Sequence, residues 1–276
     1  MNKPMKKLNT EYQEWDAHCE KHGPYRVRGI VINGKRIGGI CPKCEEERMQ
    51  KQQQEEQARQ KRERAAMLER LLGSAGIPPR FQGRTFANFR VERDNQGQAS
   101  ALRLCRAYAK RFHEMMAAGT CLIMVGSPGT GKTHLASAIA QSVIIDGRSV
   151  VHFTTAGRLL RHVKSTYGRD SAQTEEQAIR SYLAPDLLIV DEVGVQRGTD
   201  AERFILTEVL GLRYEYMKPV IVIGNCTEDE LRSHLGDRLY SRLQEGGGSV
   251  IVFDWDDYRP KVHRDERLPW RRVPPA

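Results

Sequence analysis

The sequence lacks long apolar runs and is poor in cysteine. These absences argue against a membrane-spanning protein and against a disulfide-rich one. No apolar run approaches the ~18 residues that a membrane-spanning helix needs. The opening MNKPMKKLNT continues into polar sequence, where a signal peptide would have an apolar core. Six cysteines among 276 residues are too sparse for a disulfide scaffold. We therefore predict a cytoplasmic protein whose cysteines serve a metal rather than disulfides.

Acidic residues are also in the minority, with 35 Asp and Glu against 44 Lys and Arg and a net charge of +9. This surplus favours a polyanionic partner. Nucleic acid is the first candidate and an acidic protein surface the second. A chain of this length can hold one α/β domain of roughly 150 residues with a smaller part attached.

The first 44 residues contain two pairs of metal-ligating residues. Cys19 and His22 form the first pair, and Cys41 and Cys44 form the second, each with two residues between its members. The stretch YRVRGIVINGKRIGG between the pairs contains Asn-Gly, a strong hairpin signal. Such spacing predicts a zinc-binding module over residues 1–44 with a closed, structural Zn²⁺ site. His18 is an alternative fourth ligand, and a redox Cys-x-x-Cys is the alternative function of the second pair.

A long polar helix is predicted over residues 45–72. This segment contains no Gly, Pro or β-branched residue, and it has Glu–Lys and Glu–Arg pairs four residues apart. Its first half lacks an apolar heptad pattern, so we expect a solvated or partner-binding helix rather than a coiled coil. Gly76-Ile77-Pro78-Pro79 then indicates a linker, which we extend over residues 73–100.

Short apolar runs alternate with helical segments in the rest of the chain. After a helix around residues 102–116, the runs lie at 121–125, 149–153, 186–191, 219–224 and 249–253. Unbroken runs rich in Val, Ile and Leu suit parallel strands that are buried on both faces. We predict a three-layer α/β domain with a five-stranded parallel sheet over residues 101–258 and a basic tail over 259–276.

The first of these runs leads into a phosphate-binding motif. Gly126-x4-Gly131-Lys132-Thr133 follows a predicted strand and opens a predicted helix, which is the context of a P-loop. Loop N–H groups would surround the β-phosphate, Lys132 would reach the β and γ oxygens, and Thr133 would ligate Mg²⁺. The alternative is a Gly-rich turn before an ordinary helix. The residues of the predicted nucleotide site are Gly126, Ser127, Pro128, Gly129, Thr130, Gly131, Lys132, Thr133, His134 and, from another strand, Asp191.

Two acids and an amide follow the ends of two later strands. Asp191 is expected to hold Mg²⁺, directly or through water, and Glu192 to orient or deprotonate a water that attacks the γ-phosphate. This pair favours hydrolysis over transfer to a small molecule, and two solvated acids are the alternative. Asn225 could bind the γ-phosphate or the attacking water, or it could be an ordinary turn residue.

Arginines and an aromatic residue mark two further candidate surfaces. Arg238 and Arg242 are four residues apart on a predicted helix, so one could reach the nucleotide of a neighbouring subunit as a trans arginine finger. On spacing alone, solvated surface arginines are the simpler interpretation. The basic stretch RLLRHVKSTYGR combines charge with an aromatic ring, as single-stranded DNA sites do. Its candidate DNA contacts are Arg158, Arg161, Lys164, Tyr167 and Arg169, with His162 between them.

The order GSPGTGKT, LLIVDE, Asn225 and RLYSRL on five strands resembles an AAA+ ATPase. More narrowly, GIPPRFQGRTFANFRV and FDWDDYRP resemble the DnaC-type replicative helicase loaders and the related IstB-type transposition ATPases, over roughly residues 73–260. The resemblance implies that Lys132 and Thr133 are the Walker A pair, Asp191 and Glu192 the Walker B pair, Asn225 sensor 1, Arg242 the trans finger and Arg238 its neighbour.

The chain after the last strand departs from most AAA+ proteins. Only 23 residues follow Phe253, too few for the separate C-terminal helical lid that usually carries sensor 2, and this matches the lidless loaders. Arg259 in the tail is a candidate replacement that could reach the nucleotide.

The resemblance implies an ATPase that loads a DnaB-type replicative helicase onto single-stranded DNA. ATP, Mg²⁺ and Zn²⁺ would be its cofactors, and the zinc module with the long helix would be the helicase-binding arm. A homo-oligomer is expected in the presence of ATP, DNA or helicase. The first alternative is an IstB-type transposition ATPase that acts on duplex DNA with a transposase. A P-loop small-molecule kinase and a nucleotide-binding adaptor with negligible turnover are the others.

Overall fold

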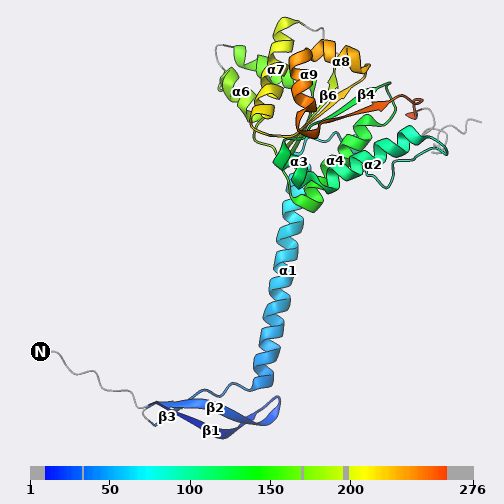
Figure 1. The fold of residues 1–276 in the computed structure, drawn as a ribbon. Helices are drawn as coiled ribbons and strands as arrows, with labels where there is room; N and C mark the ends of the chain where they lie inside the picture. The colour runs from blue at the N-terminus through cyan, green and yellow to red at the C-terminus, as the bar shows by residue number, and fades with distance from the viewer. Residues whose placement is uncertain (1–9, 33, 169–170, 195–198, 260–276) are drawn as a thin grey trace, which may run out of the picture. The chain divides into compact units, whose positions relative to one another are not determined.

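The computed structural model describes residues 10–32, 34–168, 171–194 and 199–259 (Figure 1). The chain divides into two compact units, Met1–Ala66 and Met67–Ala276. Among the described residues, no helix is both long and apolar enough to cross a membrane.

The first unit contains a three-stranded antiparallel sheet in the order β1-β2-β3. Its strands are β1 (Thr10–Cys19), β2 (Gly23–Ile32) and β3 (Lys35–Ile37). Ile32 pairs with Lys35, so two residues connect β2 to β3, as the Asn-Gly signal predicts. The polar strand β1 was not predicted, and it pairs with β2 along its whole length.

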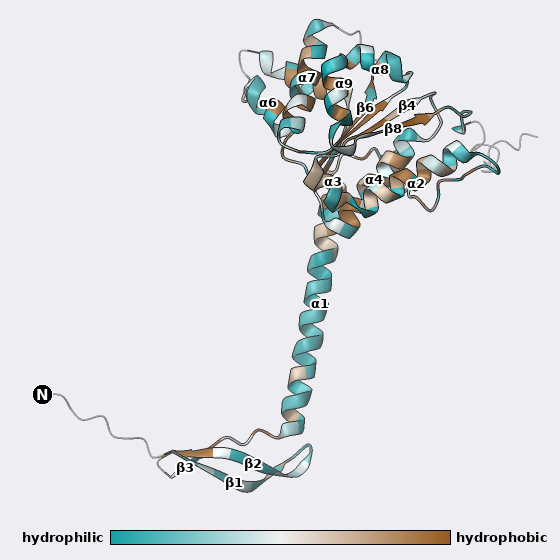
Figure 2. Ribbon diagram, in the orientation of Figure 1, coloured by the Kyte–Doolittle hydropathy of each residue, from teal (hydrophilic) through white to brown (hydrophobic). Residues whose placement is uncertain are grey.

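Helix α1 (Pro42–Ser74) is present where a helix was predicted over 45–72. Figure 2 shows that it is hydrophilic over most of its length. Exposed ion pairs such as Lys51–Glu55 and Arg59–Glu63 join successive turns. Only its last turns are apolar, and there Leu71 is buried in the core of the second unit.

The second unit is built on a five-stranded sheet in the order β5-β6-β7-β4-β8, in which every described pair is parallel. Alternate residues of β4 belong to two different core clusters, Leu122 and Met124 to one and Ile123 and Val125 to the other. Both faces are therefore buried, and the predicted sheet is confirmed. The strands are β4 (Leu122–Gly126), β5 (Val151–Thr155), β6 (Leu187–Val193), β7 (Val220–Gly224) and β8 (Ser249–Phe253).

Helices cover the two faces and complete the three predicted layers. The cluster on one face takes its helical residues from the last turns of α1 and from α2 (Gln96–Lys110), α3 (Phe112–Ala118) and α4 (Lys132–Gly147). The predicted single helix around 102–116 is therefore two helices, which meet at Arg111. The other cluster uses α5 (Ala156–Lys164), α6 (Glu175–Ser181), α7 (Asp200–Glu215), α8 (Glu228–Leu235) and α9 (Asp237–Gln244).

The prediction that residues 73–100 form a linker was wrong. Ala75 and Ile77 are buried, and the carbonyl oxygen of Ala75 accepts a hydrogen bond of 2.7 Å from the N–H of Phe153 in edge strand β5. Gly76 has a φ of +72°, and a side chain there would collide with the carbonyl oxygen of Phe153. The glycine therefore permits close packing rather than flexibility. The later part of the segment also packs on the core, through Phe81, Phe86 and Phe89.

Arg213 of α7 is a charged residue that the sequence did not mark as buried. Its side chain is 0% exposed, and its guanidinium donates to four main-chain carbonyl oxygens, those of Tyr182, Pro185, Asp186 and Pro219, at 2.7–3.2 Å. Burial lowers the pKa of this side chain to about 10. The bonds join the chain before β6 to the chain before β7.

Replacing Arg213 tests this structural role. Arg213→Ala should lower the free energy of unfolding by at least about 3 kcal/mol, because several buried carbonyl oxygens lose their donor. Arg180→Ala removes an exposed arginine that pairs with Glu176 and should change it by no more than about 0.5 kcal/mol. Urea unfolding of both variants measures the difference. Equal midpoints would contradict the assignment.

Candidate nucleotide site and metal centre

The predicted phosphate loop connects β4 to α4 at the carboxyl edge of the sheet. Gly126, with φ +129°, ends β4 opposite Phe253 of β8, and a side chain there would collide with the carbonyl oxygen of Phe253. Gly131, with φ +99°, precedes the first turn of α4, where a side chain would meet the ring of Phe89. The loop is thus packed between β8 and the segment before α2. It leads into the N-terminus of α4, and a helix N-terminus is a favourable place for an anion.

Lys132 is only 3% exposed. Its ammonium donates to the carbonyl oxygens of Gly126 at 2.8 Å and Ser127 at 2.7 Å. Burial lowers the pKa of Lys132 to about 8, and the negative charge of Asp191 opposes that shift. A buried cation in this position gains from an anion in the loop.

The two predicted Mg²⁺ ligands lie together. The hydroxyl of Thr133 donates to Oδ2 of Asp191 at 2.8 Å, and Asp191 is 6% exposed. Burial raises the pKa of this carboxyl, while Thr133 and the N–H of Glu192, which donates to Oδ1 at 2.7 Å, act in the opposite sense. Neighbouring octahedral oxygen ligands about 2.1 Å from Mg²⁺ are about 3.0 Å apart, so the 2.8 Å separation of this pair is close to what the ion needs.

The predicted water-positioning residues surround the same edge. Glu192 is exposed and has a φ of +60°, which is unusual outside glycine. Asn225 is exposed just after β7, and the carbonyl oxygen of the next residue, Cys226, accepts a hydrogen bond of 2.9 Å from the N–H of Gly126. The structure thus brings Asn225 beside the phosphate loop.

Two loop contacts were not predicted. The ring of His134 contacts the chain before α2, through a hydrogen bond of 2.9 Å between Nε2 and the carbonyl oxygen of Thr85 and an edge contact with Phe89. The indole N–H of Trp255 donates to the carbonyl oxygen of Thr130 at 2.9 Å. The sequence carried a signal for both contacts. Thr85 and Phe89 lie in GIPPRFQGRTFANFRV and Trp255 lies in FDWDDYRP, the two stretches that carry the narrower family resemblance.

The structure does not place the paired arginines at this phosphate loop. Arg238 and Arg242 line a surface groove between α7 and α9, and the Arg242 guanidinium lies 5.1 Å from the ring centre of Tyr214. Arg238 is exposed and Arg242 is half-buried. The role of trans arginine finger, in which one of these arginines would reach the nucleotide of a neighbouring subunit, stays a prediction.

Of the four predicted DNA contacts that the structure describes, two use their polar atoms within the protein. The Lys164 ammonium pairs with Glu202 of α7 at 3.1 Å, and the Tyr167 hydroxyl donates to Glu175 at 2.8 Å, although the Tyr167 side chain is exposed. His162 bonds to the Tyr182 hydroxyl. Arg158 and Arg161 are exposed on α5, whose buried face consists of Ala156, Leu159, Leu160 and Val163. Arg169 lies outside the described residues.

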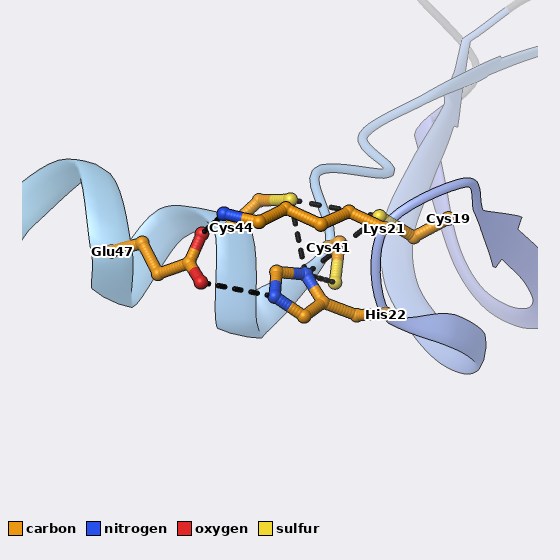
Figure 3. Close-up of polar contacts among 6 residues, drawn as sticks. All are labelled: Cys19, Lys21, His22, Cys41, Cys44 and Glu47. Atoms are coloured by element: carbon orange, nitrogen blue, oxygen red, sulfur yellow. Dashed lines mark hydrogen bonds and ion pairs between the residues drawn. The ribbon is translucent and has the colours of Figure 1, made fainter.

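The four predicted metal ligands meet in the first unit (Figure 3). Cys19 and His22 flank the turn between β1 and β2, and Cys41 and Cys44 lie at the start of α1. The described separations are 3.5 Å between the Cys19 and Cys44 sulfurs and 3.3–3.8 Å from each sulfur to Nδ1 of His22. Tetrahedral Zn²⁺ with bonds of about 2.3 Å holds two sulfurs about 3.8 Å apart, so the donor set fits zinc.

The hydrogen bond between the Cys19 and Cys44 sulfurs acts on the pKa values of both thiols, lowering that of Cys19 and raising that of Cys44. The N–H groups of His22 and Lys21 lower the pKa of Cys19 to about 6. The hydrogen bond with Cys19 is the largest cause that raises the pKa of Cys44, to about 11. A second thiolate would therefore need a cation, which a bound metal supplies.

Glu47 contacts the Cys/His cluster through His22, and this contact was not predicted. Its carboxylate accepts from Nε2 of His22 at 3.1 Å and pairs with Lys21 (Figure 3). This bond places the ring proton on Nε2 and leaves Nδ1, the atom that faces the three sulfurs, free to ligate. Spacing could have pointed to Glu47 in the sequence, because it lies three residues, or about one helical turn, after Cys44 on the predicted helix.

Comparison with known proteins identifies the family. The family model described as IstB-like ATP binding protein matches residues 47–242. Curated proteins named Replicative helicase loader DnaC from Buchnera aphidicola subsp. Schizaphis graminum and Escherichia coli strain K12 are 34% and 35% identical to the chain. These matches cover 74% and 72% of this chain and 81% and 78% of those proteins.

Solved structures share the fold. The DnaC helicase loader structure has a TM-score of 0.55 at 22% identity and covers 64% of this chain and 100% of its own. AMPPCP-bound DnaA from Aquifex aeolicus has a TM-score of 0.54 at 22% identity and covers 70% of this chain and 57% of its own. The sheet, the phosphate loop and these similarities together show that the chain has an AAA+ fold and belongs to the family of IstB-like ATP binding proteins, which here includes relatives named DnaC.

Proposed function

We propose that the chain is a cytoplasmic, ATP-dependent helicase loader that delivers a DnaB-type replicative helicase onto single-stranded DNA. The observation that carries this proposal is the 34–35% identity to proteins named Replicative helicase loader DnaC, over most of their length. The +9 charge agrees with a DNA partner.

Hydrolysis of ATP is the proposed reaction. Lys132 binds the β- and γ-phosphates, and Glu192 orients or deprotonates the attacking water, with Asn225 beside it. Thr133 and Asp191 hold the Mg²⁺, which neutralises phosphate charge when bound. Two observations support these roles, the burial of Lys132 and the hydrogen bond between Thr133 and Asp191. Arg242, with Arg238 beside it, is proposed to act on the nucleotide of a neighbouring copy in a homo-oligomer.

Single-stranded DNA is proposed to bind along α5. Arg158 and Arg161 offer exposed charge, and the exposed ring of Tyr167 offers a stacking surface. Lys164 contributes only if it leaves Glu202, because one ammonium cannot hold both that carboxylate and a phosphate in the present geometry. Arg169 completes the proposed set.

The zinc-binding module is proposed to be the part that captures the helicase. Cys19, His22, Cys41 and Cys44 hold Zn²⁺ in a closed site, so the ion stabilises the module and does not take part in catalysis. The nucleotide residues lie in the other unit, from Gly126 onward. We therefore expect capture of helicase and binding of ATP to be separable.

An IstB-type transposition ATPase is the second candidate, because the matching family model has an IstB-like description. Such a protein would act on duplex DNA with a transposase. The kinase alternative is set aside because the chain belongs to this family.

The catalytic assignment predicts different losses for two variants. Lys132→Ala should abolish ATP binding, whereas Glu192→Gln should keep it and lower kcat by about 100-fold or more, since only Glu192 acts on the water. Calorimetric binding and phosphate-release rates measure both. Glu176→Gln, an exposed change on α6, is the control. A wild-type rate in Glu192→Gln would show that its proposed role is wrong.

The loader proposal predicts capture of a DnaB-type helicase by the immobilised full chain. Cys41→Ser combined with Cys44→Ser should lose this capture but bind ATP as the wild type does, because the two sites lie in different units. Retained capture by the double variant would move the partner site out of the zinc module. If the wild type captures no helicase with or without ATP but responds to duplex DNA and a transposase, the transposition candidate replaces the loader.

The metal site predicts about one zinc per chain and a role for Glu47. Glu47→Gln should weaken zinc binding by about tenfold, because His22 loses the carboxylate that orients its ring. Glu46→Gln, at an exposed neighbouring position of α1, should not. Competition with a chromophoric chelator measures both affinities. Zinc well below one equivalent in the wild-type protein would remove the metal assignment.

A further inference from the structure

The ring of Tyr214 lies against the guanidinium of Arg242. Tyr214 belongs to the last turn of α7 and Arg242 to the last turn of α9, and the guanidinium carbon is 5.1 Å from the ring centre. At this distance the negative charge of the ring face attracts a cation. Both residues are half-buried, so water weakens this attraction less than it would at a fully exposed site.

The hydroxyl end of the Tyr214 ring is held by Glu245. The Tyr214 hydroxyl donates a hydrogen bond to the Glu245 carboxylate, and this bond is the largest cause of the raised pKa of Tyr214, while the charge of Arg242 acts in the opposite sense. The N–H of Glu245 in turn donates to the carbonyl oxygen of Arg242. Arg242, Tyr214 and Glu245 therefore form a closed set of contacts.

The turn that follows α9 is attached to the chain before β4. The hydroxyl of Thr120 donates to the carbonyl oxygen of Gly246 at 2.8 Å. Gly246 has a φ of +68°, and a side chain there would lie 2.9 Å from the carbonyl oxygen of Ala118. Because Glu245 is the residue before Gly246, its carboxylate is carried by a part of the chain that is packed on the second unit.

Among the described residues, no carboxylate forms an ion pair with Arg242. Other arginines of this unit do have such partners, for example Arg180 with Glu176 and Arg232 with Asp237. Arg242 instead lines the surface groove between α7 and α9. Its guanidinium is thus oriented by a ring and keeps its donors for an anion from outside the chain.

We propose that Tyr214, oriented by Glu245, is a positioning residue that holds the Arg242 guanidinium ready to act on the nucleotide of a neighbouring copy. This inference rests on the proposed trans role of Arg242. A ring attracts the cation without taking up its N–H donors as a carboxylate would. A side chain that is already ordered loses less entropy when it meets a phosphate. Tyr214 therefore affects the rate through Arg242 and does not contact the nucleotide.

The first test measures phosphate release by the full chain with ATP, Mg²⁺ and single-stranded DNA. Tyr214→Leu should lower kcat by about tenfold and change KM by less than about twofold, because the ATP site of each copy is intact. Tyr214→Phe keeps the ring but loses the bond to Glu245, and should lower kcat by only about threefold. Tyr216→Leu, at an exposed tyrosine just after α7, is the control and should keep the wild-type rate. Urea unfolding checks that each variant is folded.

Two combinations test whether Tyr214 acts through Arg242. Tyr214→Leu combined with Arg242→Ala should be no slower than Arg242→Ala alone, because the ring then has no guanidinium to position. Tyr214→Leu chains should also regain turnover when they are mixed with Lys132→Ala chains, whose Arg242 and Tyr214 are intact. A defect within the ATP site of the Tyr214→Leu copy would not be relieved by such a partner.

The outcomes separate this inference from the functions on which it rests. Wild-type turnover in Tyr214→Leu, with slow turnover in Arg242→Ala, overturns the inference and leaves the trans arginine in place. Additive losses in the double variant, or faster turnover in Tyr214→Leu, also overturn it. If Arg242→Ala keeps the wild-type rate, the trans role itself is wrong and Tyr214 has nothing to position. No turnover by the wild-type chain contradicts the proposed ATPase reaction, and failure to capture a helicase contradicts only the loader function.

Discussion

The parallel pairing of β4 with β7 and β8 is the constraint on which the nucleotide site depends. Because these strands run in one direction, their carboxyl ends lie along one edge of the sheet. The phosphate loop, Asn225 and residues 254–259 each follow one of those ends, and β6 adds Asp191 and Glu192 beside β7. The parallel sheet thus brings segments that are far apart in the sequence to one edge.

Arg213 and Lys132 are both buried cations of the second unit, but their charges are stabilised in different ways. Arg213 is surrounded by four carbonyl oxygens of the chain before β6 and β7, so its charge is met by structure that needs no ligand. Lys132 donates to two carbonyl oxygens of the phosphate loop and lies near the buried Asp191, whose pKa is raised by the same loss of water. Burial costs of this kind are tolerated where a ligand offsets them.

The first unit depends on a different source of stability. Among its described residues, only Val27 and Cys41 are buried apolar side chains, which is a very small core. Three thiols and an imidazole at ligand distances provide an alternative, since metal binding in a small module is largely its folding free energy. The hydrophilic α1 agrees with this division, because its buried contacts are confined to the last turns, which belong to the second unit.

The sequence by itself determined the five apolar strands, the phosphate loop and its two acids, and the cluster of three cysteines and one histidine, because each depends on residue types at short, fixed spacing. Only the tertiary structure decided what depends on distant partners. The Gly- and Pro-rich segment near Gly76 packs against β5, polar β1 becomes a strand by pairing with β2, and Lys164 pairs with Glu202 across two helices. Burial of Arg213 and the hydrogen bond from the N–H of Tyr258 to the carbonyl oxygen of Gly129 likewise come from contacts between segments far apart in the chain, which local propensity does not encode.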